Sequence, residues 1–129
     1  PPTVVIEQPP TMPPNLTPVT SCQQCFPYKS VLDEAVRFYL LGIYDTSVYA
    51  TMGCGDMPDW DVTCVTDMSR LFYRDGFDTD ISAWDVGNVR IMDEMFSGAS
   101  NFNQDMSSWD VAQVISMSNM FEYASNFNQ

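Results

Sequence analysis

The chain has 129 residues, with 17 acidic residues, five basic residues and no histidine, for a formal net charge of −12. This length suits one folded body. The negative charge repels phosphate backbones and anionic membrane surfaces, so nucleic acid is not an expected partner. No apolar run reaches the roughly 18 residues that a membrane span needs, and the absence of histidine removes Ser/His and Cys/His nucleophile systems. We therefore expect a protein without a membrane span, without enzymatic activity and without a cofactor.

A proline-rich segment opens the sequence. Residues 1–21 hold seven of the nine prolines, which predicts an extended tail or stalk with no core of its own. Within it, Val4, Val5 and Ile6 form a short β-branched run that could add to another chain as a strand. Asn15 begins a glycosylation sequon, so we expect either a sugar-bearing tail of a glycoprotein or an unmodified linker.

Residues 22–59 are interpreted as an N-terminal cap stapled by disulfides. Cys22, Cys25, Cys54 and Cys64 are the four cysteines, and they allow three pairings between which the sequence does not choose. A zinc site or free thiols are the alternatives, but two disulfides fit best, and they indicate a secreted protein in an extracellular or cell-surface setting. A Ser-x-x-Asp pattern at Ser30 and a glycine after Leu41 predict one helix over residues 30–41, which would cap the repeats or bind a partner.

Three similar blocks fill the rest of the chain. Trp60, Trp84 and Trp109 each open a Trp-Asp-Val, 24 and then 25 residues apart, which divides this part into 60–83, 84–108 and an incomplete 109–129. The matched apolar positions are Val65, Val89 and Val114; Met68, Met92 and Met117; Leu71, Met95 and Met120; and Phe72, Phe96 and Phe121. Such a period indicates small units that bury their apolar faces by stacking. The spacing predicts an α/β repeat solenoid, with one short strand and one short helical turn in each repeat.

These motifs resemble a known repeat. The runs from Trp60 to Phe72 and from Met95 to Trp109 are similar to the repeat of about 25 residues in surface lipoprotein-associated proteins, a relative of the BspA-like leucine-rich repeats. The similarity covers residues 26–129. It implies a leucine-rich-repeat-like solenoid on a secreted or surface-anchored protein with an adhesive role, and it carries no catalytic motif.

Several aspartates are candidates for chemistry. Asp56, Asp59 and Asp61 precede or open the first repeat, and Asp78 and Asp80 lie near its end. Carboxylates at alternating positions suit calcium, and a carboxylate pair suits hydrolysis, although neither group has the spacing of a known calcium loop. A solvated acidic surface is the simpler interpretation.

The final repeat stops within a coil, which leaves Met120, Phe121 and Phe127 without a following repeat. From this pattern we expect a structural or adhesive protein that assembles with its own kind into a filament or surface layer. The alternative is a recognition module for a host protein, matrix component or glycan, with Asp67, Asp93 and Ser118 lining the binding surface.

Overall fold

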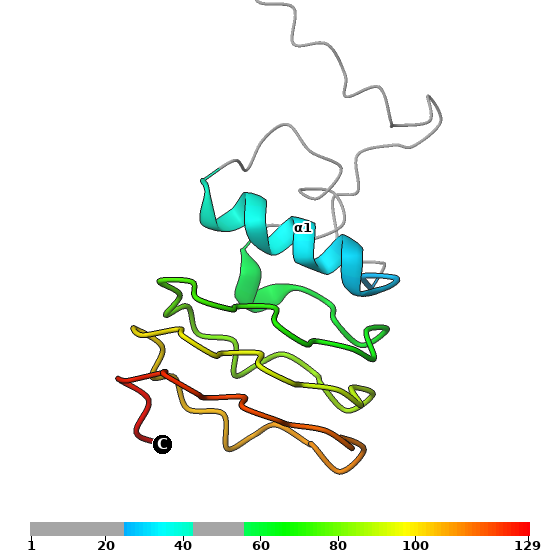
Figure 1. Cartoon of the computed structure of the whole chain (residues 1–129). Coiled ribbons are helices and arrows are strands. Elements are labelled where there is room, and N and C mark those ends of the chain that lie inside the picture. Colours follow the sequence, from blue (N-terminus) through cyan, green and yellow to red (C-terminus); the bar gives the residue numbers. More distant parts are fainter. Residues whose placement is uncertain (1–24, 43–55) are drawn as a thin grey trace, which may run out of the picture.

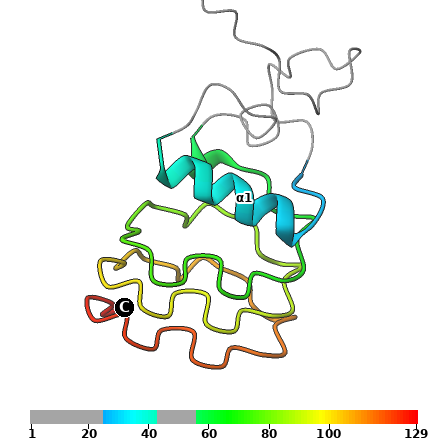
Figure 2. The same ribbon diagram turned by 45° about the horizontal axis from the view of Figure 1, so that its top comes forward.

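The computed structural model describes residues 25–42 and 56–129 (Figure 1). Helix α1 spans Lys29–Leu40, and a single 3₁₀ turn, η1, spans Met57–Asp59. Three coils follow, which we name coil 1 (60–83), coil 2 (84–108) and coil 3 (109–129). The coils lie one on another, with α1 across the free side of coil 1 and the C-terminal residue in coil 3 at the opposite end (Figures 1 and 2).

The expected α/β solenoid is wrong. In the described residues no sheet forms, and the only strand-like pairing consists of isolated parallel bridges from Ile91 to Asp67 and to Ser116. The repeats are built from consecutive turns. The N–H of Leu71 donates to the carbonyl of Met68, three residues earlier, and bonds with this spacing recur along each coil. Residues at positive φ interrupt each coil twice, which prevents a continuous strand or helix. They are Arg70, Arg74, Glu94, Gly98, Asn119 and Tyr123.

Helix α1 lies one residue earlier than the predicted 30–41. Tyr28, not Ser30, occupies the capping position and makes no side-chain capping bond, while Lys29 pairs with Asp33 at 2.6 Å. The helix gives way to Gly42, whose φ of +73° suits glycine. Its buried residues are Leu32, Ala35 and Val36, at the spacing of one helical face, so this face packs on coil 1.

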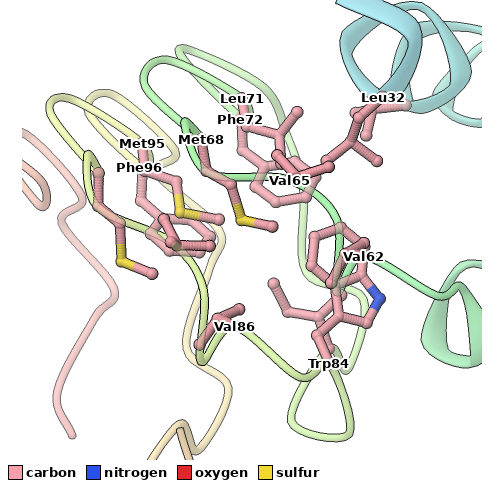
Figure 3. Packing of buried hydrophobic residues seen from close by; sticks show 14 of the residues in the cluster. Leu32, Val62, Val65, Met68, Leu71, Phe72, Trp84, Val86, Met95 and Phe96 are labelled. Atoms are coloured by element: carbon pink, nitrogen blue, oxygen red, sulfur yellow. The ribbon is translucent and has the colours of Figure 1, made fainter. Parts of the chain in front are cut away.

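The core consists of matched side chains from successive coils. Phe72 stacks on Phe96 with ring centroids 5.4 Å apart, and Phe96 stacks on Phe121 at 5.5 Å. Met68 and Met95, both fully buried, point into the same interior (Figure 3). Each coil thus covers the apolar face of the one before it, as the sequence period requires.

The tryptophans that open the repeats also fix how the coils align. The indole Nε1–H of Trp84 donates to the carbonyl of Met57 at 2.8 Å, and that of Trp109 donates to the carbonyl of Ile81 at 3.1 Å. Each indole therefore reaches back past the whole preceding coil, to a carbonyl three residues before that coil begins. This satisfies the polar atom of a buried or half-buried ring.

A disulfide joins Cys25 to Cys64, with their Cα atoms 5.6 Å apart. The bond ties the segment before α1 to the first turn of coil 1. Cys22, Cys54, Asn15 and the run from Val4 to Ile6 lie outside the described residues. No helix in the described part of the chain is long and apolar enough to cross a membrane.

Candidate functional site

The coils are joined by one repeated pattern of backbone hydrogen bonds. N–H groups at alternate residues of one coil donate to carbonyls at alternate residues of the next, at distances of 2.7–2.9 Å. From coil 1 to coil 2 the pairs are Met68 to Ile91, Arg70 to Asp93, Phe72 to Met95 and Arg74 to Ser97. From coil 2 to coil 3 they are Met92 to Ser116, Glu94 to Ser118, Phe96 to Met120 and Gly98 to Glu122. In these two sets of four bonds the earlier coil donates. At the start of each set the later coil donates instead: Arg90 and Ile91 to the carbonyl of Thr66, and Ile115 and Ser116 to the carbonyl of Arg90.

Coil 3 carries the same donors without acceptors. Its equivalent positions are Met117, Asn119, Phe121 and Tyr123, and we call their four N–H groups the donor row. Within residues 25–42 and 56–129 no acceptor bonds to any of them. Unpaired N–H groups at alternate residues form a template for an additional extended segment.

Coil 3 exposes apolar side chains at positions that are buried in the earlier coils. Met117 is 42% exposed and Val111 is 39% exposed, whereas the equivalent residues of coils 1 and 2 are at most 1% exposed: Met68, Met92, Val62 and Val86. Phe121 and Phe127 are half-buried, while Met120 points inward and is 7% exposed. We call this surface, with the donor row, the open face. Of the predicted assembly residues it includes Phe121 and Phe127, but not the buried side chain of Met120.

Polar side chains at another corner of the coils also propagate from coil to coil. The N–H of Asn103 donates to Oδ1 of Asp78 at 3.1 Å, and the N–H of Asn128 donates to Oδ1 of Asn103 at 2.9 Å. Gln104 and Gln129 add side-chain bonds to the same two acceptors. This ladder runs opposite to the main pattern, because here the later coil donates.

The other end of the stack is covered. Tyr39 of α1 packs edge-on against Trp60 of coil 1, with ring centroids 5.6 Å apart, and Phe26 packs against the same indole at 5.2 Å. The N–H of Phe26 donates to the carbonyl of Asp61. The side of coil 1 that faces away from coil 2 is therefore not available to a coil of a second copy.

The candidate calcium and catalytic aspartates serve mainly as turn residues. Asp61 accepts bonds from the N–H and hydroxyl of Thr63, Asp80 accepts the Ser82 N–H, and Asp78 belongs to the amide ladder. Hydrogen bonds from the backbone and side chain of Ser82 lower the pKa of Asp80. Asp56 and Asp59 flank or end η1, where the N–H of Asp59 donates to the carbonyl of Asp56. Across the described residues no group of three or more His, Cys, Asp or Glu side chains is placed to hold a metal ion.

The residues expected to line a recognition surface are engaged within the stack. Asp67 accepts the N–H of Ser69, and Asp93 accepts the N–H of Ser118 at 2.8 Å together with the hydroxyl of Ser116. Asp93 and Ser118 thus join coil 2 to coil 3. An Asp93→Lys change would disturb this junction, so it cannot report on ligand binding alone.

A shallow groove of about 310 Å³ lies between α1 and coil 1. Its lining residues are Asp33, Val36, Arg37, Leu40, Leu41, Leu71 and Asp75. Partial burial there raises the pKa of the Asp75 carboxyl. Because no buried polar group without a partner faces the groove among the described residues, the geometry favours the open face as the candidate site.

Sequence reasoning placed Phe121 and Phe127 on this face, but it wrongly included the buried Met120 and missed the exposed Val111 and Met117 as well as the donor row. Side-chain patterns carry no direct signal for backbone N–H direction. The repeat itself was the available signal, since any edge bond formed by one repeat must have an equivalent in the next.

Comparison with known families gave a match. The model of a family described as "Mycoplasma protein of unknown function, DUF285" matches residues 42–129. No curated protein and no solved structure matches the chain significantly.

Proposed function

The chain belongs to the family described as "Mycoplasma protein of unknown function, DUF285", and we propose that it is a non-enzymatic structural or adhesive protein of the cell surface or extracellular space that assembles with its own kind. One observation carries this proposal. The open face combines a row of four N–H donors with exposed Val111 and Met117, and a surface of this kind is stabilised when a further coil or another chain covers it.

The disulfide supports the proposed location. The bond between Cys25 and Cys64 closes a separation of 39 residues and holds the segment before α1 onto coil 1. Structural disulfides persist in oxidising compartments and are rare in the cytosol. An extracellular or surface setting is therefore the environment that suits this chain.

Charge shapes how such an assembly behaves. At a net charge of −12, two copies repel each other over the Debye length, which is about 10 Å at 0.1 M salt. Salt screens this repulsion while apolar contacts persist. Self-association through the open face should therefore strengthen as salt rises from low to moderate concentration.

Sedimentation velocity of the whole 129-residue chain tests the proposal, over a range of concentrations at low and moderate salt. A Met117→Glu variant puts a charge on the open face, and a Ser100→Glu variant adds the same charge at an exposed position of coil 2. We expect Met117→Glu to weaken association about tenfold or more, because burying an unpaired charge is costly, and Ser100→Glu to have little effect.

A chain that stays monomeric at every concentration and salt would overturn the proposal. That result would favour the alternative, in which the protein is a recognition module for a host protein, matrix component or glycan. Equal weakening by both variants would show that charge alone, and not the open face, governs association.

A further inference from the structure

Resting on the proposed self-assembly, we propose that two copies bind side by side, with the arginine side of one against the acidic side of the other. The arginine side is the row of residues 66–74 in coil 1 together with the row 90–98 in coil 2, which backbone hydrogen bonds join. The acidic side is the other long side of the stack, residues 78–85 and 103–110 (Figure 2). Both surfaces run along the flanks of the stack, so this contact involves neither of its ends.

The charges of the coils are divided between these two sides. The arginine side carries Arg70, Arg74 and Arg90, which are three of the five basic residues in the chain. The acidic side contains no lysine or arginine. Its carboxylates are all exposed: Asp78, Asp80, Asp85, Asp105 and Asp110. At a net charge of −12, two copies repel each other in most orientations, whereas this orientation brings opposite charges together.

The arginine side also carries three carboxylates, but each is engaged within the stack. Asp67 accepts a backbone N–H of its own coil, and Asp93 accepts bonds from coil 3. Glu94 pairs with Arg70, with Oε2 and Nε 3.1 Å apart. These acidic groups therefore do not cancel the charges of the remaining two arginines.

Those two arginines, Arg74 and Arg90, are exposed and have no carboxylate partner in residues 25–42 and 56–129. Arg74 is also held in place. Its Cζ lies 5.1 Å from the centroid of the Tyr73 ring, and a Cβ on Gly98 would lie 2.8 Å from its Cγ, so its stem packs on the bare backbone of coil 2. A side chain that is already ordered loses less entropy when it binds a carboxylate.

The carboxylates of the acidic side are ordered as well. Oδ1 of Asp80 accepts the Ser82 N–H at 2.9 Å, and Oδ1 of Asp85 accepts the Gly87 N–H at 3.0 Å. Hydrogen bonds from Ser82 lower the pKa of Asp80, so this group keeps its charge to lower pH. A carboxylate has about four acceptor sites, so each retains capacity for a guanidinium from another chain.

The arginines and carboxylates lie at matching places on the two sides. Arg74 and Asp80 lie on either side of the turn at one end of coil 1, and Asp85 and Arg90 lie on either side of the turn at the other end, where coil 2 begins (Figure 1). A second copy shifted sideways without rotation therefore brings Arg74 to Asp80 and Arg90 to Asp85. Because every copy presents both sides, this contact repeats from copy to copy without closing into a ring.

Two charge-reversed variants of the full chain test the inference. The first carries Arg74→Glu and Arg90→Glu, which opposes carboxylates to carboxylates. The second carries Asp80→Lys and Asp85→Lys, which opposes cations to cations. In a mixture, the new glutamates of the first variant face the new lysines of the second, and the natural arginines of the second face the natural aspartates of the first.

By sedimentation velocity, we expect each variant alone to associate at least about tenfold more weakly than the natural chain, and an equimolar mixture to regain the natural affinity within about threefold. The lysine variant is less negative than the natural chain, so net charge alone predicts stronger association for it. A control with Glu34→Lys and Arg37→Glu swaps two exposed charges on α1 at constant net charge and should associate as the natural chain does.

Circular dichroism and cooperative urea unfolding show whether each variant is folded. If the lysine variant is not, Asp80→Asn with Asp85→Asn takes its place, because an amide oxygen can still accept the two turn bonds. This neutral variant should associate about threefold or more weakly than the natural chain, and unchanged association would contradict the inference.

The outcomes separate this inference from the proposed function. Folded charge-reversed variants that associate as the natural chain does would overturn the inference and leave self-assembly standing. Variants that each lose association but do not regain it when mixed would also overturn it, because the arginines would then contact something other than the acidic side. A natural chain that never associates overturns both.

Discussion

The N–H of Phe96 in coil 2 donates to the carbonyl of Met120 in coil 3 at 2.9 Å, while the rings of Phe96 and Phe121 stack 5.5 Å apart. One residue thus supplies both the polar and the apolar contact between two coils. At the equivalent position of coil 3, Phe121 has its N–H in the donor row and its ring half-buried.

The indole bonds should contribute unequally to stability. Trp84 is buried and its Nε1–H bonds to the Met57 carbonyl at 2.8 Å, whereas the bond from half-buried Trp109 to Ile81 is longer, at 3.1 Å. Trp84→Phe removes one buried hydrogen bond and part of a packed ring, so we expect a loss of about 1–3 kcal/mol in the free energy of unfolding. Trp109→Phe should cost less. Urea unfolding measures both, and an equal or larger cost at Trp109 would contradict the assigned roles.

Replacing glycine should cost more at position 98 than at position 76. Gly98 has a φ of +73°, and a Cβ there would lie 2.8 Å from Cγ of Arg74. We expect Gly98→Ala to cost about 1–2 kcal/mol, from the left-handed backbone and the close contact. A Cβ at Gly76 would meet only Nδ2 of Asn101, at 3.5 Å, so Gly76→Ala should be neutral or slightly stabilising. Thermal unfolding of both variants checks the contrast, which fails if their melting temperatures shift equally.

The disulfide between Cys25 and Cys64 should hold the segment before α1 onto coil 1. Changing both residues to serine releases this crosslink from the unfolded chain, and we expect a loss of about 2–4 kcal/mol in the free energy of unfolding. Urea unfolding without reductant measures the loss. Peptide mapping of the natural chain after thiol alkylation should recover Cys25 and Cys64 in one linked pair. Recovery of either residue linked to Cys22 or Cys54 would contradict the pairing.

Two aspartates should change stability with pH in opposite directions. Burial raises the pKa of Asp75, so the folded state holds its proton more tightly and the ionised carboxylate opposes folding at neutral pH. Hydrogen bonds from Ser82 lower the pKa of Asp80, which favours folding above the unfolded pKa of about 3.9 and loses this effect as pH falls through the folded pKa.

We therefore expect Asp75→Asn to raise the melting temperature at pH 7 and Asp80→Asn to lower it. The Asp75 difference should disappear as pH falls below the unfolded pKa of about 3.9, whereas the Asp80 difference should persist until pH falls through the lowered folded pKa. Differential scanning calorimetry at several pH values measures the four curves. Shifts of the same sign at pH 7 would contradict the assigned environments.

The sequence predicted where side chains lie better than how the backbone runs. The matched positions of the first two repeats, such as Val65 and Val89, are fully buried, and a helix was predicted within one residue of α1. The secondary structure of the repeats was predicted wrongly, because consecutive turns with a left-handed residue every four positions give nearly the same apolar spacing as a helical turn. Periodicity alone does not separate the two.

The candidate site was only partly predictable, for a related reason. Phe121 and Phe127 were expected on an uncovered surface, and they are half-buried there, but Met120 points into the core. Which side of the coil each N–H faces depends on turn geometry, so the donor row emerges only from the structure. The pairing of Cys25 with Cys64 likewise depends on how α1 lies on coil 1.

Amide hydrogen exchange at single-residue resolution, followed over a range of protein concentrations, tests the central claim most directly. The amides of Met92, Glu94, Phe96 and Gly98 bond to coil 3 and should be protected at every concentration. The amides of Met117, Asn119, Phe121 and Tyr123 should exchange fast when the chain is monomeric and become protected as it associates. Fast exchange of all four in the associated state, or their protection in the monomer, would contradict a donor row that is completed by a second copy.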